Sequence, residues 1–214
     1  MTAGPARRVT SLLESPDGLI ELVTTGSGLP ATVFAHGATG SIDTTRPFGS
    51  GVAGRRTFFH FRGYGASSPA KKPMTYAALE SDLTAVADHI GATRALGVSM
   101  GAGALLSLLA RTPMRFERLV FALPASLDEP RTDDPPVGLE PSAAAPLVDR
   151  AVLGAVNAPA LVIAQEQDPD HPVRVAEQLA ASLGHARLEV LPPGGILLRH
   201  RAAMRELIGQ FLNQ

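Results

Sequence analysis

A serine flanked by glycines stands at the place in this chain best suited to nucleophilic chemistry. The residues Gly97-Val98-Ser99-Met100-Gly101 lie where a short apolar run ends and a helical pattern begins, and they fit the pattern G-x-S-x-G. A tight turn from a strand into a helix strains the serine backbone, and glycines on both sides avoid clashes that a Cβ atom would cause. Free N–H groups at the start of the helix favour a developing negative charge. The pattern therefore predicts Ser99 as a nucleophile; the alternative is a small-residue cluster that only packs a helix against a strand.

A glycine-containing loop upstream could supply the hydrogen-bond donors that such a nucleophile needs. The apolar run Ala31–Ala35 leads directly into the loop His36–Gly40. When a serine attacks an acyl group, the oxyanion is stabilised by two backbone N–H groups, one after the nucleophile and one from a loop of this kind. We therefore expect the N–H groups of Ala38 and Met100 to form the oxyanion hole, with His36 anchoring the loop.

Short β-like runs alternate with helical stretches along the chain, as an α/β protein requires. The predicted helices are Tyr76–Ile90, Met100–Arg111, Val173–Ser182 and Arg199–Leu212. The predicted strands, several of them continuous apolar runs typical of buried parallel strands, are Leu19–Val23, Ala31–Ala35, Thr57–Phe61, Arg94–Val98, Arg118–Ala122, Ala160–Ala164 and Arg187–Leu191. This order predicts an α/β fold with a mostly parallel central sheet and helices on both faces.

The length and composition favour one domain. A chain of 214 residues with 45% hydrophobic residues can bury one substantial core and is short for two. The segment Pro124–Pro159, rich in Pro, Ala and Asp, interrupts the rhythm and is either a mobile lid or a short helical insertion. We therefore expect a single domain, residues 1–214, with a short lid-like insertion at about 124–159.

Charge and residue usage exclude several classes of function. A formal net charge of -1 with scattered arginines gives no basic surface of the kind that binds nucleic acid. The absence of cysteine rules out disulfides, thiolate metal sites and a cysteine nucleophile. The six histidines show no paired ligand spacing, so we expect no metal and no cofactor. Without an apolar leader or spanning segment, the sequence predicts a cytoplasmic protein that does not bind membranes.

Taken together, the motifs resemble those of the α/β-hydrolase fold family from about Leu19 to the end of the chain. The matching segments are His36-Gly37, Phe61–Gly65, the glycine-flanked serine, and Gln167–Pro172 after a late strand. The resemblance implies a serine hydrolase with a minimal cap or none, acting on an ester, thioester or related acyl compound. It also implies that the triad acid is the aspartate of the last loop, Asp168 by matching position, with Asp170 as a second choice.

The chain departs from the family at the catalytic base. Family members usually carry the triad histidine in a Gly-His pair after the final strand, and the matching position is Gly195. A serine hydroxyl is a weak nucleophile until a base takes its proton. The open candidates are His200 in the following helix, His171, which could instead cap the next helix, and His60 near the end of a strand.

Two functions therefore remain open from the sequence. The first is a small serine hydrolase with a relocated base and a small-molecule acyl substrate. The second is a catalytically impaired protein of the same fold that binds a small apolar ligand or a protein partner, because fold does not guarantee chemistry. The oligomeric state is open in both.

Overall fold

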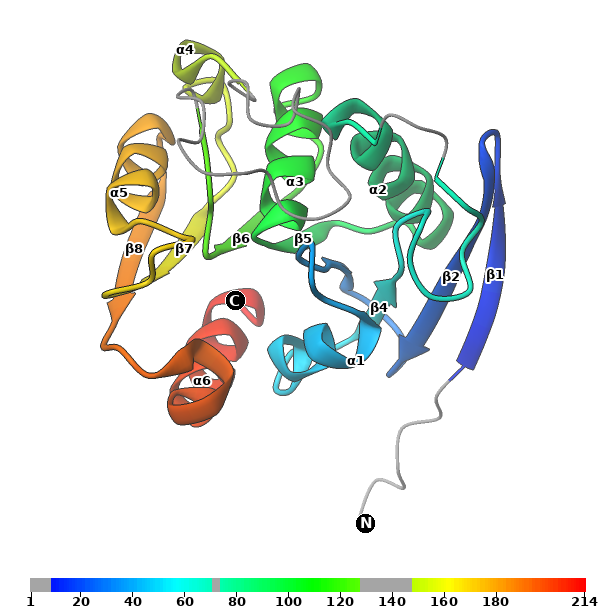
Figure 1. The fold of residues 1–214 in the computed structure, drawn as a ribbon, viewed down its shortest axis with the longest axis horizontal. Coiled ribbons are helices and arrows are strands. Elements are labelled where there is room, and N and C mark those ends of the chain that lie inside the picture. The colour runs from blue at the N-terminus through cyan, green and yellow to red at the C-terminus, as the bar shows by residue number, and fades with distance from the viewer. Residues whose placement is uncertain (1–8, 71–73, 128–147) are drawn as a thin grey trace.

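The described part of the chain folds around one twisted sheet. The computed structural model describes residues 9–70, 74–127 and 148–214, and these form an eight-stranded sheet in the order β1-β2-β4-β3-β5-β6-β7-β8 (Figure 1). Strands β1 and β2 form an antiparallel hairpin, β2 is antiparallel to β4, and every pair from β4 to β8 is parallel. The strands are β1 Val9–Ser15, β2 Gly18–Thr25, β3 Ala31–Ala35, β4 Arg55–Phe59, β5 Arg94–Val98, β6 Arg118–Ala122, β7 Ala160–Gln165 and β8 Ala186–Leu191.

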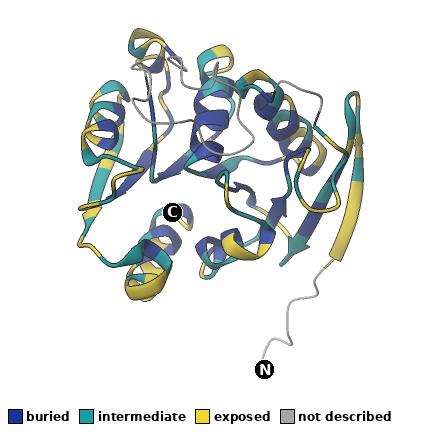
Figure 2. Ribbon diagram, in the orientation of Figure 1, coloured by how far each residue is buried: buried dark blue, intermediate teal, exposed yellow. Residues whose placement is uncertain are grey.

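Helices cover both faces of this sheet, which confirms the predicted fold class. The helices are α1 Ile42–Thr45, the 3₁₀ turn η1 Arg46–Gly49, α2 Tyr76–Ile90, α3 Met100–Arg111, α4 Arg150–Leu153, α5 Val173–Ser182 and α6 Arg201–Leu212. One apolar cluster packs α2, α3 and α5 on the sheet, and a second packs α1, η1 and α6 on its other face. The buried residues lie between these layers, whereas β1 is largely exposed (Figure 2). Among the described residues, no helix has the length and apolar character needed to cross a membrane.

The order of the central strands creates the place for a site. Strand β3 pairs with β4 on one side and with β5 on the other, so the chain moves away from β3 in opposite directions. In open α/β sheets, ligands bind beyond the carboxyl ends of the strands at such a switch point. The loop after β3 begins at His36 and the turn after β5 contains Ser99, so the topology brings the two predicted loops together.

Several element boundaries differ from the sequence predictions. Strand β4 ends at Phe59 rather than Phe61, and α6 begins at Arg201 after a π-helical turn, Gly195–Arg199. Strand β1 was not predicted, because most of its side chains are exposed and give no buried apolar run. Part of the predicted lid-like insertion, residues 128–147, lies outside the described residues; its last part contains α4.

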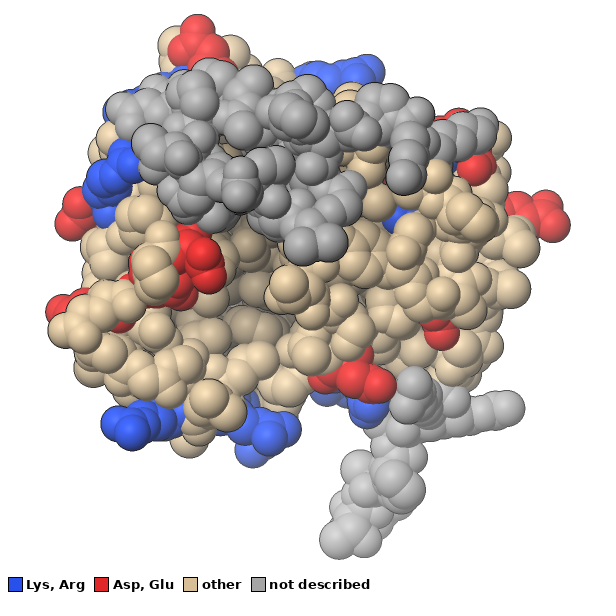
Figure 3. Space-filling view, in the orientation of Figure 1, with Lys and Arg blue, Asp and Glu red and all other residues tan. Residues whose placement is uncertain are grey.

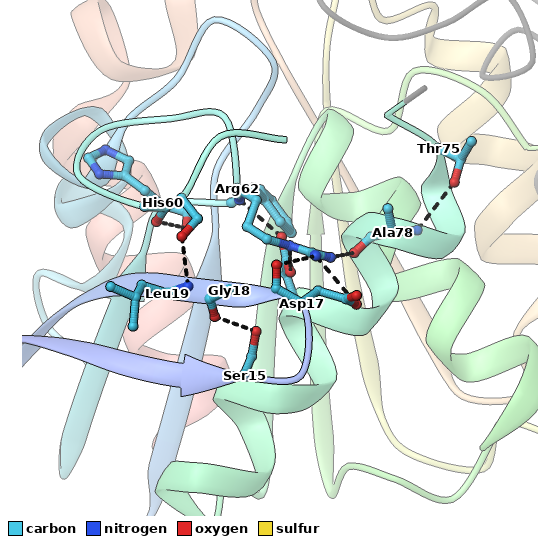
Figure 4. A network of polar contacts seen from close by, with 12 residues as sticks. Ser15, Asp17, Gly18, Leu19, His60, Arg62, Thr75 and Ala78 are labelled. Carbon is cyan, nitrogen blue, oxygen red and sulfur yellow. Dashed lines mark hydrogen bonds and ion pairs between the residues drawn. The ribbon is translucent and has the colours of Figure 1, made fainter. Parts of the chain in front are cut away.

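A buried arginine joins the hairpin to the rest of the domain. Arg62 Nε donates to Asp82 Oδ1 over 2.6 Å, and the Arg62 backbone N–H donates to Asp82 Oδ2 over 3.0 Å. The guanidinium also lies 3.3 Å from Asp17 Oδ2 in the β1–β2 turn and donates to the Ala78 carbonyl in α2, so it lies between the hairpin and the helix (Figure 4). Burial raises the pKa of the Asp82 carboxyl, and the bonds from Arg62 offset part of that rise.

Candidate active site

The turn between β5 and α3 has the strained geometry expected of a nucleophile elbow. Ser99 has φ 50° and ψ -109°, a region that residues with a side chain rarely occupy, at a cost of about 1–3 kcal/mol. The surrounding hydrogen bonds hold this conformation: the Ser99 N–H donates to the Ala122 carbonyl over 2.9 Å, and the Ser99 carbonyl accepts from Gly103 N–H over 3.1 Å. The sheet and the helix together therefore fix the position of the hydroxyl.

Glycines permit this turn, as the sequence pattern predicts. A Cβ atom on Gly97 would overlap the carbonyl oxygen of Gly101, and one on Gly101 would overlap the carbonyl oxygen of Ala35 at the end of β3. Because both obstacles are backbone atoms, they cannot rotate away. The close packing of α3 on β3 and β5 therefore depends on hydrogen at these two positions.

His171 brings an imidazole to the serine hydroxyl. Its Nε2 lies 2.9 Å from Ser99 Oγ, and its Nδ1 lies 3.0 Å from Asp168 Oδ2. With Asp168 ionised, the proton of the neutral ring lies on Nδ1 and Nε2 is the acceptor for the hydroxyl proton. These distances are within the reach required of a general base and of the group that orients it.

The loop after β7 holds both members of this pair. Asp168 Oδ1 accepts the backbone N–H groups of Asp170 over 3.0 Å and of His171 over 3.2 Å, so the carboxylate closes the turn while its other oxygen faces the imidazole. The Asp168 and His171 side chains are 16% and 17% exposed, so both are partly accessible to solvent. The face beyond the carboxyl ends of the strands is hollowed near its centre, next to acidic side chains over the β7–α5 loop (Figure 3).

Asp170, the second choice of acid, lies in the same turn with an exposed side chain, and its backbone N–H donates to Asp168. The other two predicted base candidates make their polar contacts away from Ser99. The closest polar contact of His200 Nε2 among the described residues is the Pro193 carbonyl oxygen at 3.5 Å, and the residue precedes α6 instead of lying within it. His60 accepts the Ile42 N–H at Nε2 and bonds Glu21 through Nδ1, so both of its ring nitrogens are engaged. The expected capping role of His171 is wrong, because Pro172 is the N-cap of α5 and no side chain caps this helix.

The loop after β3 lies against the nucleophile. A Cβ atom on Gly37 would lie 3.4 Å from Ser99 Cβ and 4.0 Å from its Oγ, which brings this loop to van der Waals distance. Ala38 directly follows Gly37, and Met100 directly follows Ser99, so the two predicted oxyanion donors belong to the backbone segments that meet at the hydroxyl.

The buried side chain of His36 holds the loop after β3 in place. Its side chain is fully buried, with Nδ1 2.7 Å from the Gly37 carbonyl and Nε2 accepting the Phe61 N–H over 3.2 Å. This pairing places the ring proton on Nδ1 and requires the neutral form. Burial lowers the pKa of His36 to about 4, which keeps the ring neutral at physiological pH.

Tyr64, which was not predicted as a site residue, lies beside His36 and Met100. The Tyr64 ring packs edge-on against His36 at a centroid distance of 4.6 Å, and its hydroxyl donates to Met100 Sδ over 3.7 Å. Burial raises the pKa of Tyr64, so the hydroxyl stays protonated. Its place in the glycine-rich turn after β4, beside the same sheet edge, is the sequence signal that could have identified it.

The geometry brings together a hydroxyl, an imidazole nitrogen within hydrogen-bond distance of it and a carboxylate in contact with the other ring nitrogen. This order of groups suits attack on an acyl carbon followed by protonation of the leaving group. Among the described residues, no group of three or more His, Asp or Glu side chains is arranged to hold a metal ion.

Comparison with known proteins gives a family and a set of structural relatives. The family model described as "alpha/beta hydrolase fold" matches residues 30–144, and a comparison with curated proteins finds no significant match. The esterase EaEST from Exiguobacterium antarcticum has a TM-score of 0.80 at 19% identity, covering 96% of this chain and 100% of that one. The carboxylesterase CesB from Bacillus subtilis has a TM-score of 0.77 at 16% identity, covering 97% of this chain and 92% of that one.

A third solved structure extends this comparison to an enzyme named for a different substrate. The 2-hydroxy-6-oxo-6-phenylhexa-2,4-dienoate hydrolase from Rhodococcus sp. strain RHA1 has a TM-score of 0.80 at 19% identity, covering 98% of this chain and 100% of that one. At 16–19% sequence identity, the similarity to these three structures shows a common fold.

Proposed function

Because this chain belongs to the α/β hydrolase fold family, we propose that it is a serine hydrolase acting on an ester, thioester or related acyl substrate. Ser99 is the nucleophile, His171 the general base and Asp168 the acid that orients it. One observation carries the proposal: the imidazole of His171 contacts the Ser99 hydroxyl at 2.9 Å and the Asp168 carboxylate at 3.0 Å.

The reaction begins with transfer of the Ser99 proton. The hydroxyl oxygen attacks the acyl carbon while His171 Nε2 takes the proton, and the carboxylate of Asp168 stabilises the imidazolium that forms. The backbone N–H groups of Ala38 and Met100 donate to the oxyanion of the tetrahedral intermediate. His171 then gives its proton to the leaving alcohol or thiol as the acyl–oxygen or acyl–sulfur bond breaks, leaving an acyl-serine.

Water completes the cycle by the same groups. His171 Nε2 takes a proton from a water molecule as its oxygen attacks the acyl-serine. Collapse of the second tetrahedral intermediate releases the carboxylic acid, and the proton returns from His171 to the Ser99 oxygen. The enzyme ends in its starting protonation state, so the reaction needs no cofactor.

The choice of acyl ester as the first substrate rests on two supports. Two of the structural relatives are named esterase and carboxylesterase, and the central hollow is lined mostly by uncharged surface in the space-filling view (Figure 3). A short-chain p-nitrophenyl ester therefore suits the assay, because its acyl group is uncharged and its leaving group is coloured.

Active-site labelling tests the proposal directly. A fluorophosphonate reacts with an activated serine, so we expect covalent labelling of the folded wild-type protein that is lost in Ser99→Ala and strongly slowed in His171→Gln. The matched control is Ser182→Ala, since that hydroxyl donates to Gln178 in α5 and lies outside the proposed site. Folded wild-type protein that neither labels nor cleaves acyl esters would instead support the binding protein considered above.

A further inference from the structure

A second concave site lies on the face of the sheet covered by α1 and α6. A hollow of about 430 Å³ opens between α1, η1, β4 and the first turn of α6. Three arginines from three separate elements line it, Arg46, Arg56 and Arg201, and Asp43 is the one carboxylate in its lining. We call this the arginine hollow. Its lining residues do not include any member of the Ser99 site.

Arg56 lines the arginine hollow from strand β4. Its Nη1 donates to the Gly49 carbonyl over 3.3 Å, and its buried Nε has no hydrogen-bond partner among the described residues. A buried donor without a partner destabilises the folded state. The side chain is also confined by the β2–β3 connection, since a Cβ atom on Gly26 would lie 3.0 Å from Arg56 Nη2. The guanidinium is therefore held in place with hydrogen-bonding capacity to spare.

The charges of Arg46 and Arg201 are only weakly compensated by neighbouring side chains. Arg46 Nη1 lies 3.6 Å from Asp43 Oδ1, and the Asp43 side chain is 76% exposed, so solvent screens this contact. Arg201 is the first residue of α6, and the N-cap residue His200 provides no side-chain hydrogen bond to this helix. The positive end of the α6 dipole thus adds to the charge of the three guanidinium groups.

The balance of charge defines the ligand. The three arginines and one aspartate that line the hollow leave an excess of two positive charges. Guanidinium groups match oxyanions with two parallel hydrogen bonds. We propose that the arginine hollow binds a phosphate-type dianion, either as the free ion or as the phosphate group of a small phosphomonoester. The arginine hollow is separate from the Ser99 site, so phosphate binding there does not depend on the proposed acyl hydrolysis.

Isothermal titration calorimetry tests the proposal with two probes, inorganic phosphate and glucose 6-phosphate, at constant ionic strength maintained with sodium chloride. We expect saturable binding of one equivalent to the wild-type protein and an upward shift of the melting temperature at saturation. Tighter binding of glucose 6-phosphate would identify a phosphomonoester, and equal or weaker binding would identify the free ion.

Matched arginine variants locate the binding. Arg56→Gln and Arg201→Gln should each weaken phosphate binding at least tenfold, and Arg46→Gln should weaken it by a smaller factor. Arg111→Gln, which removes a 74% exposed guanidinium from α3 on the opposite face, should leave it unchanged. Should Arg56→Gln fail to fold, Arg201→Gln still decides the matter, because its side chain is exposed. The absence of saturable heat in the wild-type protein, or an equal loss in Arg111→Gln, would overturn the proposal.

Discussion

Replacing His171 with glutamine removes the proton acceptor that the structure brings to Ser99. Glutamine is similar in size, but its amide cannot take up the hydroxyl proton. Loss of the base in a serine triad lowers the rate by about 10⁴- to 10⁶-fold, equal to roughly 5–8 kcal/mol of transition-state stabilisation. We therefore expect kcat for a p-nitrophenyl ester to fall by this factor, while KM changes little.

The structure also sets the expected effect of this change on stability. The substitution removes one hydrogen bond to Asp168, worth about 1 kcal/mol. The turn itself remains closed because Asp168 Oδ1 accepts two backbone N–H groups. The melting temperature should therefore stay within a few degrees of the wild-type value. Chemical rescue sharpens the assay: imidazole added to His171→Gly should restore part of the activity by supplying the missing base.

The control for this experiment is His200→Gln, since His200 contacts Pro193 rather than Ser99. It should retain wild-type kcat. Wild-type activity in His171→Gln together with loss of activity in His200→Gln would refute our assignment and return the base to the loop after β8.

Three further predictions follow from the described contacts. Gly195→His, which installs the family residue, should lower stability by about 1–3 kcal/mol in urea denaturation, because Gly195 has φ +81°; increased esterase activity at an unchanged melting temperature would contradict this. Gly101→Ala should destabilise by about 3 kcal/mol or more, because the new methyl group overlaps the Ala35 carbonyl oxygen; an unaltered urea midpoint would show that the backbone can relax there. His36 binds its proton less readily in the folded state, where burial lowers its pKa from 6.5 to about 4, so its contribution is complete above pH 6.5 and disappears as the pH falls to 4. The loss amounts to about 3 kcal/mol, and His36→Gln should flatten this part of the stability curve; parallel curves for the two proteins would argue against it.

Most helices and central strands could be predicted because the capping residues and the apolar periodicity of the sequence agree with the burial of each element in the fold. The bounds of α2, α3 and α5 coincide with the sequence predictions. In α2 the Thr75 side chain accepts the Ala78 N–H at the start, and Gly91 adopts the left-handed conformation at the end. Strand β3 is buried throughout, and β5 and β6 are buried except at terminal residues. Such short apolar runs are recognisable in the sequence.

The contact between His171 and Ser99 could not be predicted from the sequence, because it depends on a distance across the sheet. Ser99 follows β5 and His171 follows β7, two strands away, and their separation of 72 positions carries no local signal. Strand β1 could not be predicted because most of its side chains are exposed. It is held by backbone pairing with β2 and, at the β1–β2 turn, by the contact of Asp17 with Arg62.

Asp168 and His171, the acid and base of the proposed mechanism, lie in a single turn after β7. In this arrangement the pair is pre-assembled within a single four-residue stretch, so its internal alignment does not depend on where the last strand ends. Under the proposed mechanism, proton transfer therefore sets no requirement on the length of the segment between β8 and α6.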